Sequence, residues 1–239
     1  MIFIKFINNF FRQLRYSLYI FYIKLMINDI SFNQFSKKED GLKKLFDKYG
    51  SDKGNLNYKH NYSKFYSELF DKIKLKKINL LEVGLGSVDP QINFHMKFMG
   101  SNYKPLASLF AWREYFTNGD IYGADIDKKI LTTYHRINTF YVDMLNKNSI
   151  ENMWSEINNK MDIIIDDGFH SFEANINLFK NSYDFLKKNG FYIIEDVHRK
   201  PNNIRKFYQF FKSKNIKFKI IDLYHSGNVN DNCLILIEK

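Results

Sequence analysis

Hydrophobic and polar positions alternate along most of the chain in a pattern that predicts repeated strand–helix units. Short apolar runs predict seven strands, at 78–83, 121–125, 139–142, 161–165, 191–194, 217–223 and 232–237. Apolar residues at helical spacing predict helices at 40–50, 61–73, 107–115, 149–158, 172–188 and 202–214. This alternation predicts a mostly parallel sheet with helices on both faces. The last two strands leave no room for a crossover helix, so we expect them to pair antiparallel.

The first 27 residues carry a separate helical pattern. Their apolar positions recur three or four residues apart, at Phe3, Ile7, Phe10, Leu14, Leu18, Phe21 and Leu25. Basic residues interrupt any apolar run long enough to span a bilayer, and no small-residue cleavage site follows. We therefore divide the chain into an N-terminal amphipathic segment, residues 1–30, and one α/β domain, residues 31–239.

The apolar face of this N-terminal segment is too continuous to be left in water. We favour burial against protein, in particular a neighbouring subunit, and therefore expect a homo-oligomer. The alternative is a helix that lies on an anionic membrane and meets it with basic residues, namely Lys5, Arg12, Arg15 and Lys24.

The sequence LLEVGLG at 80–86 predicts a buried strand followed by a tight turn. Gly84 and Gly86 permit a sharp backbone turn with room for a ligand. Glu82 places a carboxylate at the end of this strand. The next strand ends at Asp125, where a ribose-binding acid is expected, although somewhat later than the usual spacing. The two strands together indicate a cofactor that contains adenosine.

Acidic residues follow each of the first five predicted strands. They are Glu82, Asp125, Asp143, the pair Asp166 and Asp167, and the pair Glu195 and Asp196. Open α/β sheets bind their ligands at this carboxyl edge. A single acid there is often only a turn or capping residue, but five in succession favour a functional site.

Composition and missing motifs exclude several classes of protein. The 239 residues, 45% of them apolar, suit one α/β domain. The single cysteine, Cys233, excludes an internal disulfide and agrees with a reducing cytoplasm. The net charge of +10 comes from scattered residues in an Asn-, Lys- and Ile-rich chain, so we expect no nucleic acid partner. Asp89 stands where a dinucleotide-binding fingerprint requires its third glycine, which argues against a nicotinamide dehydrogenase.

The motifs together resemble those of class I S-adenosylmethionine-dependent methyltransferases, and more narrowly the metal-dependent sugar O-methyltransferases of the macrocin and mycinamicin type. The resemblance covers roughly residues 45–200. It rests on YGSDKG at 49–54, HNY at 60–62, FY at 65–66, LEVGLG at 81–86, SL at 108–109, WREYF at 112–116, IDDGFH at 165–170 and IED at 194–196. It implies a Rossmann-like, mostly parallel seven-stranded sheet with an antiparallel last strand.

The resemblance also implies a role for each candidate residue. Residues that would hold S-adenosylmethionine are Glu82, Gly84, Gly86, Ser108, Asp125, Asp143 and Asp166, with Lys53 and Tyr62 in a lid over donor and acceptor. Mg²⁺ would be bound by three carboxylates, those of Asp167, Glu195 and Asp196. His170 would act as the general base beside Asp167, which we also place among the catalytic residues.

The acceptor is the least determined part of this interpretation. Phe169 and His198 depart from the family pattern next to the acceptor pocket. We expect a sugar hydroxyl, on a small molecule, a nucleotide or a glycan such as a bacterial surface polysaccharide. A catechol-like or other natural-product hydroxyl is the alternative, because a metal can bind vicinal hydroxyls of both kinds. We expect a cytoplasmic enzyme, which would lie at the inner membrane surface if residues 1–27 contact lipid.

Overall fold

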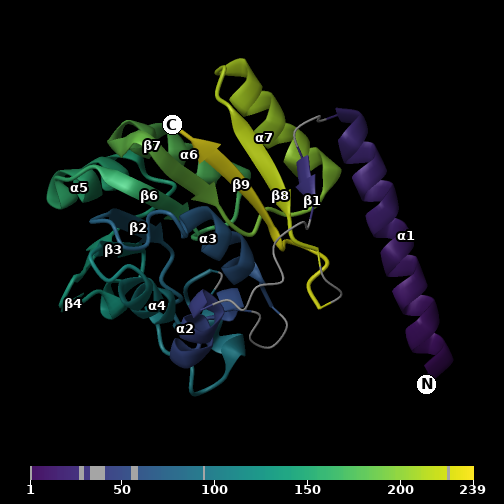
Figure 1. Ribbon diagram of the computed structural model, residues 1–239, viewed down its shortest axis with the longest axis horizontal. Coiled ribbons are helices and arrows are strands. Elements are labelled where there is room, and N and C mark those ends of the chain that lie inside the picture. Colours follow the sequence, from purple (N-terminus) through teal and green to yellow (C-terminus); the bar gives the residue numbers. More distant parts are fainter. Residues whose placement is uncertain (1, 27–29, 33–40, 55–58, 94, 225–226) are drawn as a thin grey trace.

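One nine-stranded sheet runs through the molecule (Figure 1). The computed structural model describes residues 2–26, 30–32, 41–54, 59–93, 95–224 and 227–239, and within the first helix the side chains of residues 7, 10, 11 and 13–23. The strands are β1 (Ile30–Phe32), β2 (Asn79–Val83), β3 (Asp120–Asp125), β4 (Thr133–Tyr134), β5 (Ile137–Tyr141), β6 (Met161–Asp166), β7 (Leu186–Ile194), β8 (Phe218–Asp222) and β9 (Cys233–Glu238). Their spatial order is β1-β8-β9-β7-β6-β2-β3-β5-β4.

Seven helices accompany the sheet in the described part of the chain. They are α1 (Ile2–Met26), α2 (Gly41–Tyr49), α3 (Tyr62–Phe70), α4 (Ala107–Tyr115), α5 (Lys147–Ile157), α6 (Phe172–Ser182) and α7 (Pro201–Ser213). Short 3₁₀ turns lie at η1 (Asp52–Gly54), η3 (Met96–Met99), η4 (Lys128–Ile130) and η5 (Tyr183–Phe185). No helix of the described residues is long and apolar enough to cross a membrane.

All seven predicted strands are present, and the predicted pairing is confirmed. Strand β9 runs antiparallel to both of its neighbours, β7 and β8, whereas β2, β3, β5, β6 and β7 pair in parallel. The predicted number of strands is wrong, because β1 and β4 extend the sheet at its two edges. With three and two residues, these strands are too short to show a period-two pattern.

The predicted helix at 172–188 is too long. Helix α6 ends at Ser182, and β7 already begins at Leu186. Leu186 pairs with Met161, and the register then shifts, so that Phe191 pairs with Ile163. The residues between them include Asn189, which has a positive φ of 61°. An irregular strand of this kind has no sequence period, which explains the error.

Each face of the sheet carries its own hydrophobic core. Leu81 and Val83 of β2 point into one core together with residues of α5, α6 and α7. Leu80 of the same strand points into the other core, with residues of α2, α3 and α4. Successive residues of a strand face opposite sides, so the continuous apolar run in β2 is what a sheet covered on both faces requires.

The strand order reverses at β2. The chain passes from β2 to β3 and β5 on one side, and then crosses to β6 and β7 on the other. The register places Val83 beside Asp166, and Asp166 beside Ile194. The residues that follow these three strands therefore meet at one edge, at a topological switch point where such sheets bind ligands.

A buried ion pair joins the segment after β7 to β8. Arg199 donates from Nη2 and Nε to Asp222 Oδ1, at 2.6 and 3.0 Å, and from Nη2 to the Asn232 carbonyl at 2.8 Å. Both charged side chains are almost completely buried. Tyr16 of α1 lies over this pair and stacks on Tyr224 with ring centroids 3.8 Å apart.

Replacing Arg199 by Met is expected to lower the free energy of unfolding by about 3–5 kcal/mol, because Asp222 would keep a buried charge without a partner. Urea unfolding measures this change. Lys206→Met is the matched control: its pair with Glu173 is exposed and contributes about 0–1 kcal/mol. Equal effects of the two substitutions would show that the buried pair does not support the fold.

Candidate active site

A cavity opens at the carboxyl edge of the sheet, beside the switch point. It is lined by all but one of the predicted site residues: Lys53, Tyr62, Glu82, Gly84, Gly86, Ser108, Asp125, Asp143, Asp167, His170, Glu195 and Asp196. The exception is Asp166, which is fully buried behind the lining. The structure thus brings together residues that are up to 143 positions apart in the sequence, as the strand-end pattern predicted.

The glycine turn after β2 packs closely against neighbouring segments of the chain. Gly84 and Gly86 have positive φ values of 98° and 75°. A Cβ atom on Gly84 would lie 2.0 Å from the carbonyl oxygen of Asp167, and one on Gly86 would lie 1.9 Å from the Tyr103 hydroxyl oxygen. Glycine is therefore required both by backbone conformation and by the close approach of these neighbours.

Asp125 and Asp143 stand on the β3 and β5 side of the cavity. The Asp125 carboxylate accepts hydrogen bonds from the backbone N–H groups of Leu85, at 2.6 Å, and Asp127, at 2.8 Å. Burial raises the pKa of Asp125, although these N–H donors oppose the rise. Asp143 accepts from the Leu145 N–H at 2.9 Å. Both carboxylates are thus fixed by backbone donors at the mouth of the cavity.

Two neighbouring side chains fix the carboxylate of Glu82 through hydrogen bonds. Its carboxylate is fully buried, and it accepts hydrogen bonds from the Ser108 hydroxyl, at 2.7 Å, and from the Trp112 indole N–H. Trp112 is also fully buried and belongs to the core between the sheet and α2, α3 and α4. Ser108, from the cavity lining, and Trp112, from the core behind it, therefore orient Glu82.

Lys53 brings a positive charge into the acidic edge. Its ammonium group lies 2.6 Å from Asp167 Oδ2, contacts Glu195 Oε2, and is 3.5 Å from Glu82 Oε1. Burial lowers the pKa of Lys53, but the three carboxylates, with Asp167 contributing most, raise it well above its usual value. Tyr66 donates to the other carboxylate oxygen of Glu195. Lys53 is therefore charged, and it offsets part of the negative charge of these three carboxylates.

Asp196 and two histidines form the outer part of the cluster. Asp196 Oδ1 accepts from the Tyr62 hydroxyl at 2.6 Å and lies 3.3 Å from His60 Nδ1. His60 Nε2 is 3.7 Å from Asp52 Oδ2 on η1. Burial lowers the pKa of His60, but Asp196 and Asp52 outweigh it and raise the pKa. Tyr62 and His60 thus fix one oxygen of Asp196 and leave the other toward the cavity.

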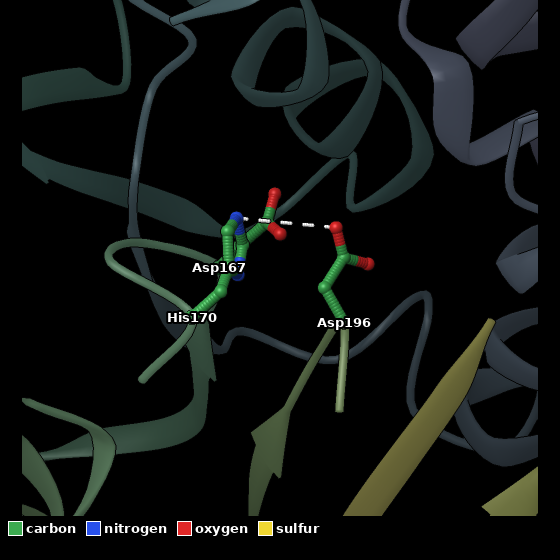
Figure 2. A group of neighbouring side chains, drawn as sticks. All are labelled: Asp167, His170 and Asp196. Carbon is green, nitrogen blue, oxygen red and sulfur yellow. Dashed lines mark ion pairs between the residues drawn. The ribbon is translucent and has the colours of Figure 1, made fainter. Parts of the chain in front are cut away.

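Three side chains are close enough together to hold a metal ion. One ligand atom each of Asp167, His170 and Asp196 can lie within 4.8 Å of the others, and His170 Nε2 is 3.9 Å from Asp196 Oδ2 (Figure 2). His170 and Asp196 both adopt positive φ, at 51° and 52°, which turns their side chains toward Asp167. The carboxylate oxygens of Asp167 and Asp196 are hard ligands, which suit Mg²⁺. Glu195, the third predicted ligand, instead pairs with Lys53 and Tyr66.

The chain is similar to known O-methyltransferases. No family model matches the chain. It is 29% identical over 160 residues to an 8-demethyl-8-alpha-L-rhamnosyl tetracenomycin-C 2'-O-methyltransferase of Streptomyces olivaceus. The aligned region covers 66% of this chain and 38% of that protein. It is also 29% identical over 138 residues to the demethylmacrocin O-methyltransferase of Streptomyces fradiae, covering 58% of this chain and 32% of that protein. The chain thus spans about two fifths or less of the length of these relatives.

Solved structures extend the likeness to the fold. The MycE methyltransferase of the mycinamycin biosynthetic pathway, solved with Mg and SAH, superposes with a TM-score of 0.62 at 21% identity, over 85% of this chain and 55% of that one. An O-methyltransferase from Bacillus cereus, solved with SAH, superposes with a TM-score of 0.54 at 12% identity. This match covers 85% of this chain and 93% of that one. The chain has the class I methyltransferase fold. The resemblance to sugar O-methyltransferases inferred from the motifs is confirmed.

Asp166 lies in a different place from the one predicted. It was assigned to donor binding, yet it is fully buried at the end of β6 and does not line the cavity. Burial raises the pKa of Asp166 to about 7. Adjacent strand residues point to opposite sides, so Asp166 faces away from the edge at which Asp167 lies.

Several residues of the site were given no role from the sequence. His60 lines the cavity and Tyr66 donates to Glu195; the quoted motifs at 60–62 and 65–66 were the only signal for them. Tyr103 and Met96 also line the cavity and come from the segment between β2 and α4. Asn55, which follows the motif at 49–54, lies outside the described residues.

Lys53→Met is expected to lower the melting temperature by about 10 °C, because three buried carboxylates would lose their counter-charge. Added Mg²⁺ should restore more stability to this variant than to the wild-type protein, since the ion can replace the missing charge. Differential scanning calorimetry, with and without the ion, measures both effects.

Lys48→Met serves as the control, because Lys48 pairs with Glu114 at the surface. A melting temperature of Lys53→Met equal to that of the control would contradict the assigned role of Lys53.

Proposed function

We propose that this protein transfers a methyl group from S-adenosylmethionine to a sugar hydroxyl, with the assistance of Mg²⁺. One observation carries the proposal. The glycine turn and Asp125, which suit an adenosine-containing donor, open into the same cavity as Asp167, His170 and Asp196, which suit a metal ion and a proton acceptor. The relatives are named as methyltransferases of sugars on tetracenomycin and macrolide compounds.

The donor would bind along the ends of β2, β3 and β5. Asp125 is held by two backbone N–H groups, so its remaining lone pairs can accept hydrogen bonds from ribose hydroxyls. Asp143, which also lines the cavity, would face the adenine amino group of the donor. The turn at Gly84 and Gly86 lines the cavity between them and the acidic cluster. SAH in the MycE complexes supports this class of donor.

Asp167 and Asp196 would hold Mg²⁺, with Glu195 close by at the end of β7. Their carboxylates fit a hard cation, and the first two already lie near each other. Bound Mg²⁺ would lower the pKa of a hydroxyl that coordinates it. Lys53 contacts Asp167 as well as Glu195 and Glu82, and a single ammonium group offsets only part of the charge of three carboxylates, which leaves negative charge for a cation to balance.

His170 would take the proton from the acceptor hydroxyl. Its Nε2 atom lies on the cavity side, 3.9 Å from Asp196 Oδ2. The methyl donor is already a sulfonium, so removal of this proton is the step in which the protein can help most. Asp196 orients the imidazole and stabilises its positive charge after the transfer.

The acceptor would enter from a wide basin next to the donor cavity. The basin has a volume of about 450 Å³ and shares Asp52, His60, Met96, His170 and Asp196 with the donor cavity. Its other described walls are mostly polar and include Lys59, His95, His198, Asn228, Asn230 and Asp231, beside the ring of Phe98. Hydroxyl-rich acceptors can hydrogen-bond with such walls, which favours a sugar over a planar catechol. A glycan or a nucleotide-linked sugar fits this basin.

Asp125→Ala is expected to weaken SAH binding by about 2–3 kcal/mol, or roughly 30- to 150-fold, because a fixed charged acceptor is lost. Isothermal titration calorimetry measures the change. Asp120→Ala, at the opposite end of β3, is the control and should bind SAH as the wild type does. If the wild-type protein does not bind SAH, the proposed donor is wrong.

Chelation should abolish methyl transfer to a nucleotide-linked sugar, and Mg²⁺ should restore it. His170→Ala should keep SAH affinity but lose about 10²- to 10⁴-fold in kcat, as expected for removal of a general base. The matched control is His135→Ala, which changes an exposed histidine between β4 and β5. Full turnover in excess chelator would refute the proposed role of Mg²⁺ in the reaction. Turnover of a catechol but of no sugar would replace the proposed acceptor class.

A further inference from the structure

The described side chains of helix α1 that pack on the domain lie on one face. Tyr19 and Ile23 are buried in the core that includes α5, α6 and α7, and Tyr16 and Ile20 pack against it. Tyr16 also stacks on Tyr224. None of these four residues belongs to the apolar stripe recognised in the sequence. The helix is therefore attached through a second apolar face.

The apolar stripe recognised in the sequence lies on the outer side of the helix. The described members with the largest exposure are Phe10, Leu14, Leu18 and Phe21, which are 56%, 44%, 60% and 64% exposed. At about 100° per residue, these positions lie roughly half a turn from Tyr19 and Ile23. Figure 1 shows α1 at the periphery of the molecule, with its N-terminal end reaching away from the sheet.

The charge of this segment decides between two possible partners for the outer face. Residues 2–26 contain Lys5, Arg12, Arg15 and Lys24 and no acidic residue. Two copies of such a helix placed side by side would repel each other. An anionic membrane would attract the helix, and it would also attract the chain as a whole, which has a net charge of +10. The expected neighbouring subunit is therefore the less favoured partner.

We propose that α1 lies in the plane of an anionic membrane surface and inserts its outer apolar stripe among the lipids. Phe10, Leu14, Leu18 and Phe21 enter the interface, while Tyr19 and Ile23 keep the helix docked on the domain. A helix with aromatic and leucine residues on one side and basic residues in the same segment binds membranes in this way. The proposal does not depend on the proposed methyl transfer, because none of the described side chains of α1 lines either cavity.

Flotation of the full-length protein with liposomes tests the proposal. The probes are phosphatidylcholine vesicles with and without 30% phosphatidylglycerol. The wild type should float with the anionic vesicles, and binding should fall at high salt because the attraction is partly electrostatic. A variant with Phe10→Ser, Leu18→Ser and Phe21→Ser should lose at least tenfold in vesicle affinity while keeping its melting temperature and SAH affinity.

Leu75→Ser is the matched control, because Leu75 is an exposed leucine, 68% accessible, outside α1. This variant should float as the wild type does. Failure of the wild type to float overturns the proposal. In that case, a dimer in sedimentation velocity that the triple substitution dissociates would assign the outer face to a second copy of the chain. Equal flotation of the triple variant and the wild type would also overturn it.

Discussion

The contact of Lys53 with Glu82, Asp167 and Glu195 is the interaction on which the candidate site depends. These carboxylates belong to the ends of three neighbouring strands, β2, β6 and β7, and the parallel register brings them together inside the protein. Buried like charges repel each other. One buried ammonium group within 3.5 Å of all three makes their proximity possible. It also ties η1, which contributes Lys53, to the edge of the sheet.

This contact divides the acidic edge into two parts. In the inner part, Lys53 contacts Glu82, Glu195 and one oxygen of Asp167, while Ser108, Trp112 and Tyr66 donate hydrogen bonds to the two glutamates. In the outer part, Asp196 is fixed by Tyr62 and His60, and together with Asp167 and His170 it faces the cavity. The inner part holds the strand ends in place. The outer part has the charge and ligand types for a cation and for the removal of a proton.

The sequence alone predicted the features that depend on local pattern. Strand ends are marked by apolar runs, and acids after those runs meet because parallel strands share an edge; Asp125 and Asp167 were found in this way. The pairing of Lys53 with Glu195 joins residues 142 positions apart and has no local signature. Asp166 was misplaced because sequence cannot tell which of two adjacent acids turns inward. Helix α1 is apolar on two opposite sides, so its pattern could not show which side packs on the domain.

A crystal structure of the protein with SAH and Mn²⁺ in place of Mg²⁺ would test the central claim most directly, because the anomalous signal locates the metal ion. The account predicts SAH along Gly84, Gly86 and Asp125, and one Mn²⁺ peak between Asp167 and Asp196, with Lys53 still in contact with Glu195. A peak at Glu82 and Glu195 with Lys53 displaced, or SAH away from the glycine turn, would contradict it.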